Sequence, residues 1–116
     1  MKKSFLTILF FLLLPQSAFA TTVYLTSGTS WTVPSDWNSS SNSIEVIGGG
    51  GAGGSAGGGG GAYSKISNLS LSSGSSVTYQ IGAGGTVWSS DGTDTYLNGN
   101  SCGASSVCAK GGATGG

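Results

Sequence analysis

Histidine is absent from this sequence of 116 residues, and that absence limits what its reactive side chains could do. Serine is abundant, but a serine nucleophile needs a neighbouring base, and only lysine remains for that role. Neither Lys65 nor Lys110 stands in a recognisable nucleophile motif, so both are interpreted as surface charges. No pair of carboxylates stands out as an acid and base couple. We therefore expect a protein that is not an enzyme and uses no cofactor.

Two cysteines, Cys102 and Cys108, lie in "NSCGASSVCAKGG" with five residues between them. Residues 1–20, described below, indicate that the chain is exported. Paired cysteines of an exported chain usually bridge, because the compartment outside the cytoplasm is oxidising. The alternative is half of a metal site, but two thiolates do not complete the four ligands of a zinc shell. The sequence favours a disulfide and no metal.

Two acidic residues, Asp91 and Asp94, lie in "SDGTD". Asp-Gly is a strong turn former, so turn formation explains them. A weak calcium site is the alternative.

Gly48, Gly50 and Gly53 formally match the dinucleotide-binding pattern G-x-G-x-x-G after a strand. That pattern requires a helix at its third glycine and an acidic residue about twenty residues later, and neither follows here. A tract this rich in glycine matches the pattern by chance, and we expect no nucleotide site.

Aromatic residues are numerous for a chain with few other bulky side chains. Trp31 and Tyr79 have the strand parity of core residues. Trp37 and Trp88 lie at expected loop positions and are the candidates for contact with a ligand, since aromatic rings stack well on sugars. The partner would be a cell-surface glycan or a protein receptor. The competing interpretation places these rings in the core.

Residues 1–20, "MKKSFLTILFFLLLPQSAFA", are typical of a secretory signal peptide, with two lysines, a short apolar run and a small-x-small end at Ala18 and Ala20. We expect cleavage after Ala20 and a secreted, periplasmic or cell-surface protein with no membrane span. In residues 21–116, two lysines against four acidic residues leave a net charge of −2. Nucleic acid is therefore not an expected partner. The oligomeric state is not predicted.

Glycine, serine and threonine make up more than half of residues 21–116, and no segment has helical periodicity. Large apolar residues are too few for a thick core, so backbone hydrogen bonds and a crosslink must contribute to stability. We expect one all-β domain at 21–116, a small β-sandwich or β-meander with glycine-rich loops.

Alternation of apolar and polar residues identifies the strands. "SSVTYQI" at 75–81 places Val77, Tyr79 and Ile81 on one face. "SIEVI" at 43–47 is another compact strand, and β-rich stretches cover 22–28, 29–37 and 62–74. In the last of these the leucines and Ile66 have opposite parity, which predicts a bulge near Asn68.

The stretch 48–61 contains eleven glycines in fourteen residues. As a linker it would be a coil, and as polyglycine II it would pack its backbone closely against other backbone. We favour the packed form, because each flank is a single strand and linkers usually join whole domains. Valine at Gly50 and Gly59 should then destabilise the fold. The glycines of this tract are Gly48, Gly49, Gly50, Gly51, Gly53, Gly54, Gly57, Gly58, Gly59, Gly60 and Gly61.

The order of these pieces resembles the glycine-rich domain of bacteriophage tail-fibre and adhesin-type proteins and of some bacterial exported proteins. The matching features are Trp31, Val33 and Pro34 as "W-x-V-P", then "IEVIGGGGAGG", then "VTYQIGAGG", and finally "AKGGATGG". The resemblance implies a non-enzymatic surface or structural module that displays loops for adhesion or assembly, with polyglycine II layers in some members. The signal peptide favours a bacterial exported protein, and the end of the sequence inside a glycine run suggests an incomplete domain. A carbohydrate-binding module using the exposed tryptophans is the alternative.

Overall fold

The computed structural model describes residues 21–116, so the expected signal peptide lies outside the described residues. The described chain is all-β, as expected. It forms two antiparallel sheets and one short 3-10 helix, and its only helical segment is too short to cross a membrane. The elements are β1 (Ser30–Thr32), β2 (Ser43–Ile47), β3 (Tyr63–Ser67), β4 (Ser76–Gln80), β5 (Thr95–Leu97), η1 (Cys102–Ala104) and β6 (Val107–Ala109).

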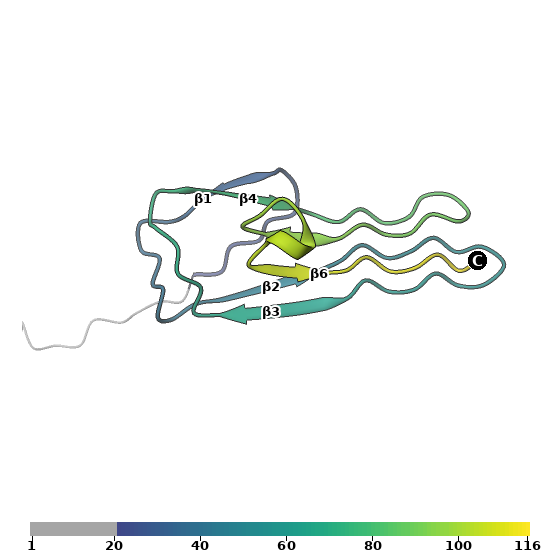
Figure 1. Cartoon of the computed structure of the whole chain (residues 1–116), viewed down its shortest axis with the longest axis horizontal. Helices are drawn as coiled ribbons and strands as arrows, with labels where there is room; N and C mark the ends of the chain where they lie inside the picture. Colours follow the sequence, from purple (N-terminus) through teal and green to yellow (C-terminus); the bar gives the residue numbers. More distant parts are fainter. Residues whose placement is uncertain (1–20) are drawn as a thin grey trace, which may run out of the picture.

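The first sheet has the strand order β1-β4-β5-β6, and the second pairs β2 with β3 (Figure 1). In the first sheet Trp31 lies opposite Val77, and Tyr79 lies opposite Leu97. In the second, Ile44 lies opposite Ile66. The two sheets pack through contacts of β2 and β3 with β6, which gives a small sandwich.

The core of the sandwich is thin, as the composition predicts. Its largest members are Tyr79 and Leu97, and the Tyr79 hydroxyl donates a hydrogen bond to the carbonyl of Ser27. Half-buried side chains, including Trp31 and Trp37, complete the packing around it. The buried core residues are Val33, Val46, Val77, Tyr79, Leu97, Val107 and Ala109.

Three strand predictions differ from the structure. Residues 22–28 form no strand, and Tyr24 in this stretch is 83% exposed, because no neighbouring strand pairs with it. Ile81 lies beyond the end of β4 and is exposed, since the ladder stops at Gln80 and a glycine segment begins. The expected bulge is instead a strand end: Asn68 has a φ of 57° and turns the chain out of β3.

Candidate functional site

The glycine tract is packed against other backbone. Its outgoing segment (48–54) and returning segment (56–62) run beside three more segments, 82–86, 90–94 and 110–116, and we call these five segments the glycine bundle. Figure 1 shows them as parallel undulating traces that leave one end of the sandwich. Hydrogen bonds between backbone groups join all five segments. The packed form that the sequence favoured is therefore the one observed.

Hydrogen bonds in the bundle repeat every three residues. The amides of Gly48 and Gly51 donate to the returning segment, at Ala62 and Gly59 over 2.9 and 2.8 Å. The amides of Gly49 and Ala52 donate to the 90–94 segment, at Thr93 and Ser90 over 3.0 and 2.9 Å. A period of three is that of the polyproline II helix, which makes no internal hydrogen bonds and leaves its backbone free to bond to neighbours.

Carbonyl groups of the same outgoing segment follow the same period. Gly112 donates to the oxygen of Gly49 over 2.7 Å, and Gly115 donates to that of Ala52 over 2.9 Å. Gly85 donates to the oxygen of Gly50 over 2.8 Å. The outgoing segment is thus bonded to all four of the others and forms the axis of the bundle.

Close approach of backbones explains why many of these residues are glycine. None of the glycines in 48–61 has a φ in the left-handed range, so glycine is not needed there for its conformational freedom. A Cβ at Gly51 would overlap the carbonyl of Ala113, and one at Gly61 would overlap that of Gly48. Backbone cannot move aside as the end of a side chain can, so these positions accept only glycine.

Other glycines of the bundle have open space beside them. A Cβ at Gly57 or Gly60 would meet no atom within 4 Å, and one at Gly50 would meet nothing nearer than 3.7 Å. A Cβ at Gly59 would lie 3.3 Å from backbone atoms of Ala113, a tight contact without overlap. Gly50 and Gly59, the positions that the sequence suggested for a test of packing, are thus poorly placed for it. Gly51 and Gly61 are the decisive ones.

Polar side chains accept hydrogen bonds from backbone amides where the sheet ladder ends and the bundle begins. The hydroxyl of Thr95, a buried residue, accepts a hydrogen bond from the amide of Gly82 over 2.8 Å. The hydroxyl of Thr93 accepts from the amide of Ala83 over 2.7 Å. These amides have left the β-ladder, and an unpaired amide at such a junction would cost free energy.

The two aspartates of the 90–94 segment hold the 110–116 segment. Asp91 accepts the amide of Thr114 over 2.8 Å, and Asp94 accepts that of Gly111 over 2.9 Å. The pairs are spaced by three residues on both segments, which is the period of the bundle. Sequence reasoning assigned these aspartates to turns, and their spacing of three was the signal that could have revealed their role.

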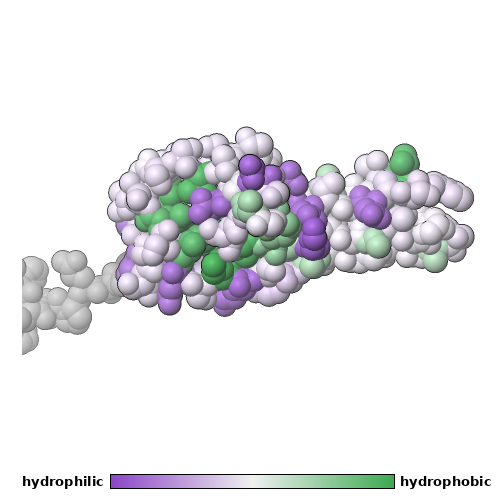
Figure 2. All heavy atoms as spheres, viewed as in Figure 1, coloured by the Kyte–Doolittle hydropathy of each residue, from purple (hydrophilic) through white to green (hydrophobic). Residues whose placement is uncertain are grey.

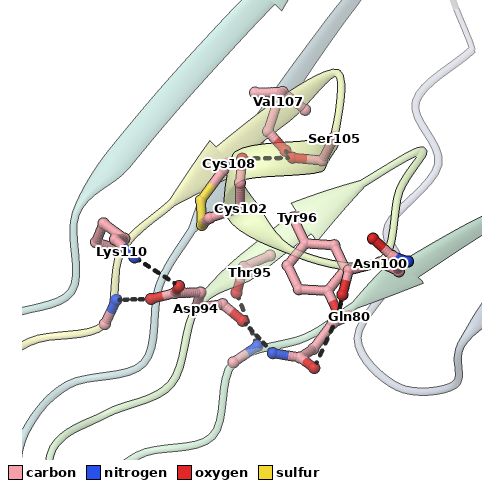
Figure 3. Close-up of a disulfide and its surroundings, with 12 residues drawn as sticks. Gln80, Asp94, Thr95, Tyr96, Asn100, Cys102, Ser105, Val107, Cys108 and Lys110 are labelled. Atoms are coloured by element: carbon pink, nitrogen blue, oxygen red, sulfur yellow. Dashed lines mark hydrogen bonds and ion pairs between the residues drawn. A yellow bond between two sulfur atoms is a disulfide. The ribbon is translucent and has the colours of Figure 1, made fainter.

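Asp94 also forms an ion pair with Lys110, whose Nζ lies 3.0 Å from Oδ2 (Figure 3). The hydrogen bond from the Gly111 amide, and then the one from Lys110, lower the pKa of Asp94 below its ordinary value. Because both oxygens of this carboxylate have partners, Asp94 stabilises the start of the last segment in its ionised form.

Cys102 and Cys108 form the predicted disulfide, which joins η1 to β6 just before the last bundle segment (Figure 3). Asp94 lies beside it, and one of its oxygens and the two sulfurs all lie within 4.8 Å of one another. A disulfide sulfur is not a thiolate, and thiolates are what bind metal ions. This cluster is therefore structural: the disulfide and the Asp94 carboxylate together fix where the bundle leaves the sheet.

A short loop at the outer end of the bundle, residues 86–90, carries the most exposed apolar side chains of that region. We call it the tip loop. Val87 is 64% exposed and Trp88 is 80% exposed. Ser90 holds the turn, because its hydroxyl accepts from the amide of Thr86 over 3.1 Å and donates to the carbonyl of Val87 over 2.8 Å. Ser89 completes it with a φ of 72°.

The two tryptophans that the sequence offered as contact residues lie in different surroundings. The ring of Trp37 is half-buried and packs edge-on against Trp31, with centroids 5.7 Å apart. Its Nε1–H donates to the carbonyl of Leu69 over 3.2 Å. Trp37 thus contributes to the rim of the core, whereas Trp88 is exposed.

The surface of the bundle differs from that of the sandwich. Figure 2 shows the bundle as mostly pale, with few strongly polar or apolar groups, whereas green and purple side chains mix over the sandwich. A comparison with proteins of curated function and with solved structures found no match. The family model described as a glycine-rich domain matches residues 24–116, which include both the sandwich and the bundle. The chain therefore belongs to the glycine-rich domain family.

Proposed function

We propose that this chain is a non-enzymatic, exported surface module in which the glycine bundle holds the tip loop away from the sandwich for contact with a partner. The observation that carries the proposal is the exposure of Val87 and Trp88 at the outer end of the bundle. Exposed aromatic rings on a fixed turn make contacts with little further loss of conformational entropy. The partner is a cell-surface glycan or a protein.

The construction of the bundle supports this proposal. A flexible glycine linker samples many conformations, and each must be lost on binding. Here the segments are fixed by backbone hydrogen bonds between neighbours, and Asp91 and Asp94 tie down the last of them. A fixed support lets the tip loop bind without that entropic penalty.

A carbohydrate-binding module is the second candidate, and the free ring of Trp88 favours it. Sugar rings stack on aromatic faces, and the two ends of a tryptophan ring suit a ligand that is part apolar and part polar. With Trp37 packed at the rim of the core, this candidate depends on Trp88 alone.

Substitution of Trp88 by alanine tests both candidates. We expect at least a tenfold loss of binding to cells or to glycans on an array, because exposed tryptophans are frequent hot spots of interfaces. Tyr24→Ala is the matched control, since Tyr24 is an equally exposed aromatic residue outside the tip loop. Loss of binding in Tyr24→Ala with none in Trp88→Ala would contradict the proposal. Saturable binding to a defined sugar would select the carbohydrate-binding candidate.

Export is tested separately by intact mass. We expect the protein recovered from outside the cytoplasm to begin at Thr21 and to lack free thiols. Recovery of a chain that retains residues 1–20, or of one found only in the cytoplasm, would count against export without bearing on the tip loop.

A further inference from the structure

The turn between β1 and β2 carries the sequence Asp36-Trp37-Asn38-Ser39-Ser40. Asn-x-Ser is the acceptor pattern for N-glycosylation when x is not proline. Asp36 lies two positions before the asparagine, so an exposed carboxylate accompanies the acceptor. We propose that Asn38 is an N-glycosylation site at which the transferase also recognises the Asp36 carboxylate. This inference goes beyond the proposed function and shares with it only the need for export.

In the structure, Asn38 is exposed and its motif is folded into a turn. Asn38 and Asp36 are both exposed. The side-chain oxygen of Asn38 accepts a hydrogen bond from the amide of Ser40 over 2.9 Å, which folds the motif into a compact turn. Within residues 21–116, the Nδ2 atom of Asn38 donates to no group, and the Asp36 carboxylate makes no ion pair. Within these residues, the Nδ2 atom that would carry the glycan and the Asp36 carboxylate are therefore both without a partner.

The position of the turn is compatible with a bulky substituent. β2 begins at Ser43, directly after this turn, and runs from there toward the bundle. The turn thus lies at the end of the sandwich opposite the bundle (Figure 1). A glycan on Asn38 would project away from the tip loop and leave Trp88 free.

The chemical step is a substitution at the anomeric carbon of the donor sugar. The donor is an oligosaccharide linked through pyrophosphate to a membrane lipid. The nitrogen of the Asn38 carboxamide forms a bond to C1 of the first sugar, and the bond from C1 to the pyrophosphate oxygen breaks. The lipid pyrophosphate leaves with the electron pair, one amide hydrogen is released as a proton, and no group is oxidised or reduced.

A second Asn-x-Ser, at Asn68, Leu69 and Ser70, provides an internal control. Asn68 is exposed, but Ile66 stands at the position that Asp36 occupies in the first motif. The backbone is engaged in both motifs, since the Leu69 amide donates to Asn42 over 3.0 Å and the Asn38 carbonyl accepts from the Asn42 side chain over 2.7 Å. The acidic residue is therefore what distinguishes the two motifs. The inference therefore assigns glycosylation to Asn38 and not to Asn68.

Intact-mass measurement on the exported full chain tests this assignment. The host should carry a bacterial oligosaccharyltransferase and its lipid-linked oligosaccharide, and an unstructured acceptor peptide should be appended after Gly116. We expect two glycans on the parent, one on the peptide and one on the chain. The chain glycan should disappear in Asn38→Gln, fall at least tenfold in Asp36→Asn and persist in Asn68→Gln.

The appended peptide separates a failure of export from a failure of the site. A modified peptide beside an unmodified chain would overturn the proposal, since export and donor are then both established. A chain glycan that survives Asn38→Gln would also overturn it, and so would one that is lost in Asn68→Gln.

Discussion

In the sandwich, stability comes from side chains: buried valines with Tyr79 and Leu97 exclude water between two sheets. In the glycine bundle there are almost no side chains to bury, and neighbouring backbones approach until their amides and carbonyls bond directly. The sandwich is therefore stabilised by buried side-chain atoms, whereas close packing of the bundle requires that its glycines carry no Cβ. Removal of a methyl group should harm the first region, and addition of one should harm the second.

The largest effect is expected from a single methyl group added inside the bundle. Gly51→Ala should destabilise the bundle by about 3 kcal/mol, at the upper end of overpacking costs, because the new Cβ overlaps backbone of Ala113. Gly60→Ala is the matched control, and its melting temperature should be almost unchanged since that position is open. Thermal melts of both variants measure this contrast. Equal melting temperatures for the two would mean that the segments are not packed in solution.

A smaller effect is expected from removal of methyl groups in the sandwich. Val33 is 1% exposed, so Val33→Ala should destabilise the fold by about 2 kcal/mol through lost burial and a residual cavity. Val87→Ala in the exposed tip loop should change the free energy of unfolding by less than about 0.5 kcal/mol. Urea unfolding followed by tryptophan fluorescence gives both values. Equal free energies of unfolding for Val33→Ala and Val87→Ala would contradict the view that buried side chains stabilise the sandwich.

The smallest effect on stability is expected from Asp94, at the junction between the sheet and the bundle, and it depends on pH. The folded-state pKa of Asp94 is lowered, so its contribution to stability is present above the unfolded pKa, near 4 for aspartate, and is lost as pH falls through the folded value. We expect the urea midpoint to fall between pH 5 and pH 2, and to fall less in Asp94→Asn, which cannot ionise. At neutral pH, Asp36→Asn should leave the urea midpoint unchanged, because Asp36 makes no ion pair in residues 21–116. An identical pH profile for the parent and Asp94→Asn would show that ionised Asp94 does not stabilise the junction between the sheet and the bundle.

Sequence patterns predicted the sandwich more completely than the bundle. Alternation at Val77 and Tyr79 located β4 and its buried face, and the presence of just two cysteines, Cys102 and Cys108, in a chain expected to be exported predicted the disulfide. Ile81 was misplaced because alternation continues in the sequence after the hydrogen-bonded ladder has stopped. Periodicity reports which side chains share a face, but it does not report whether a neighbouring strand is there.

The bundle shows what the sequence alone determined and what it did not. Periodicity predicted an all-β chain, and composition predicted a thin core and revealed a tract that is glycine in eleven of fourteen positions. It did not distinguish Gly51 from Gly60, because a glycine has no side chain whose pattern could reveal its neighbours. Only the tertiary structure decides that the first faces the carbonyl of Ala113 and the second faces open space. That choice depends on segments 82–86, 90–94 and 110–116, which lie far along the chain and meet the tract only after folding.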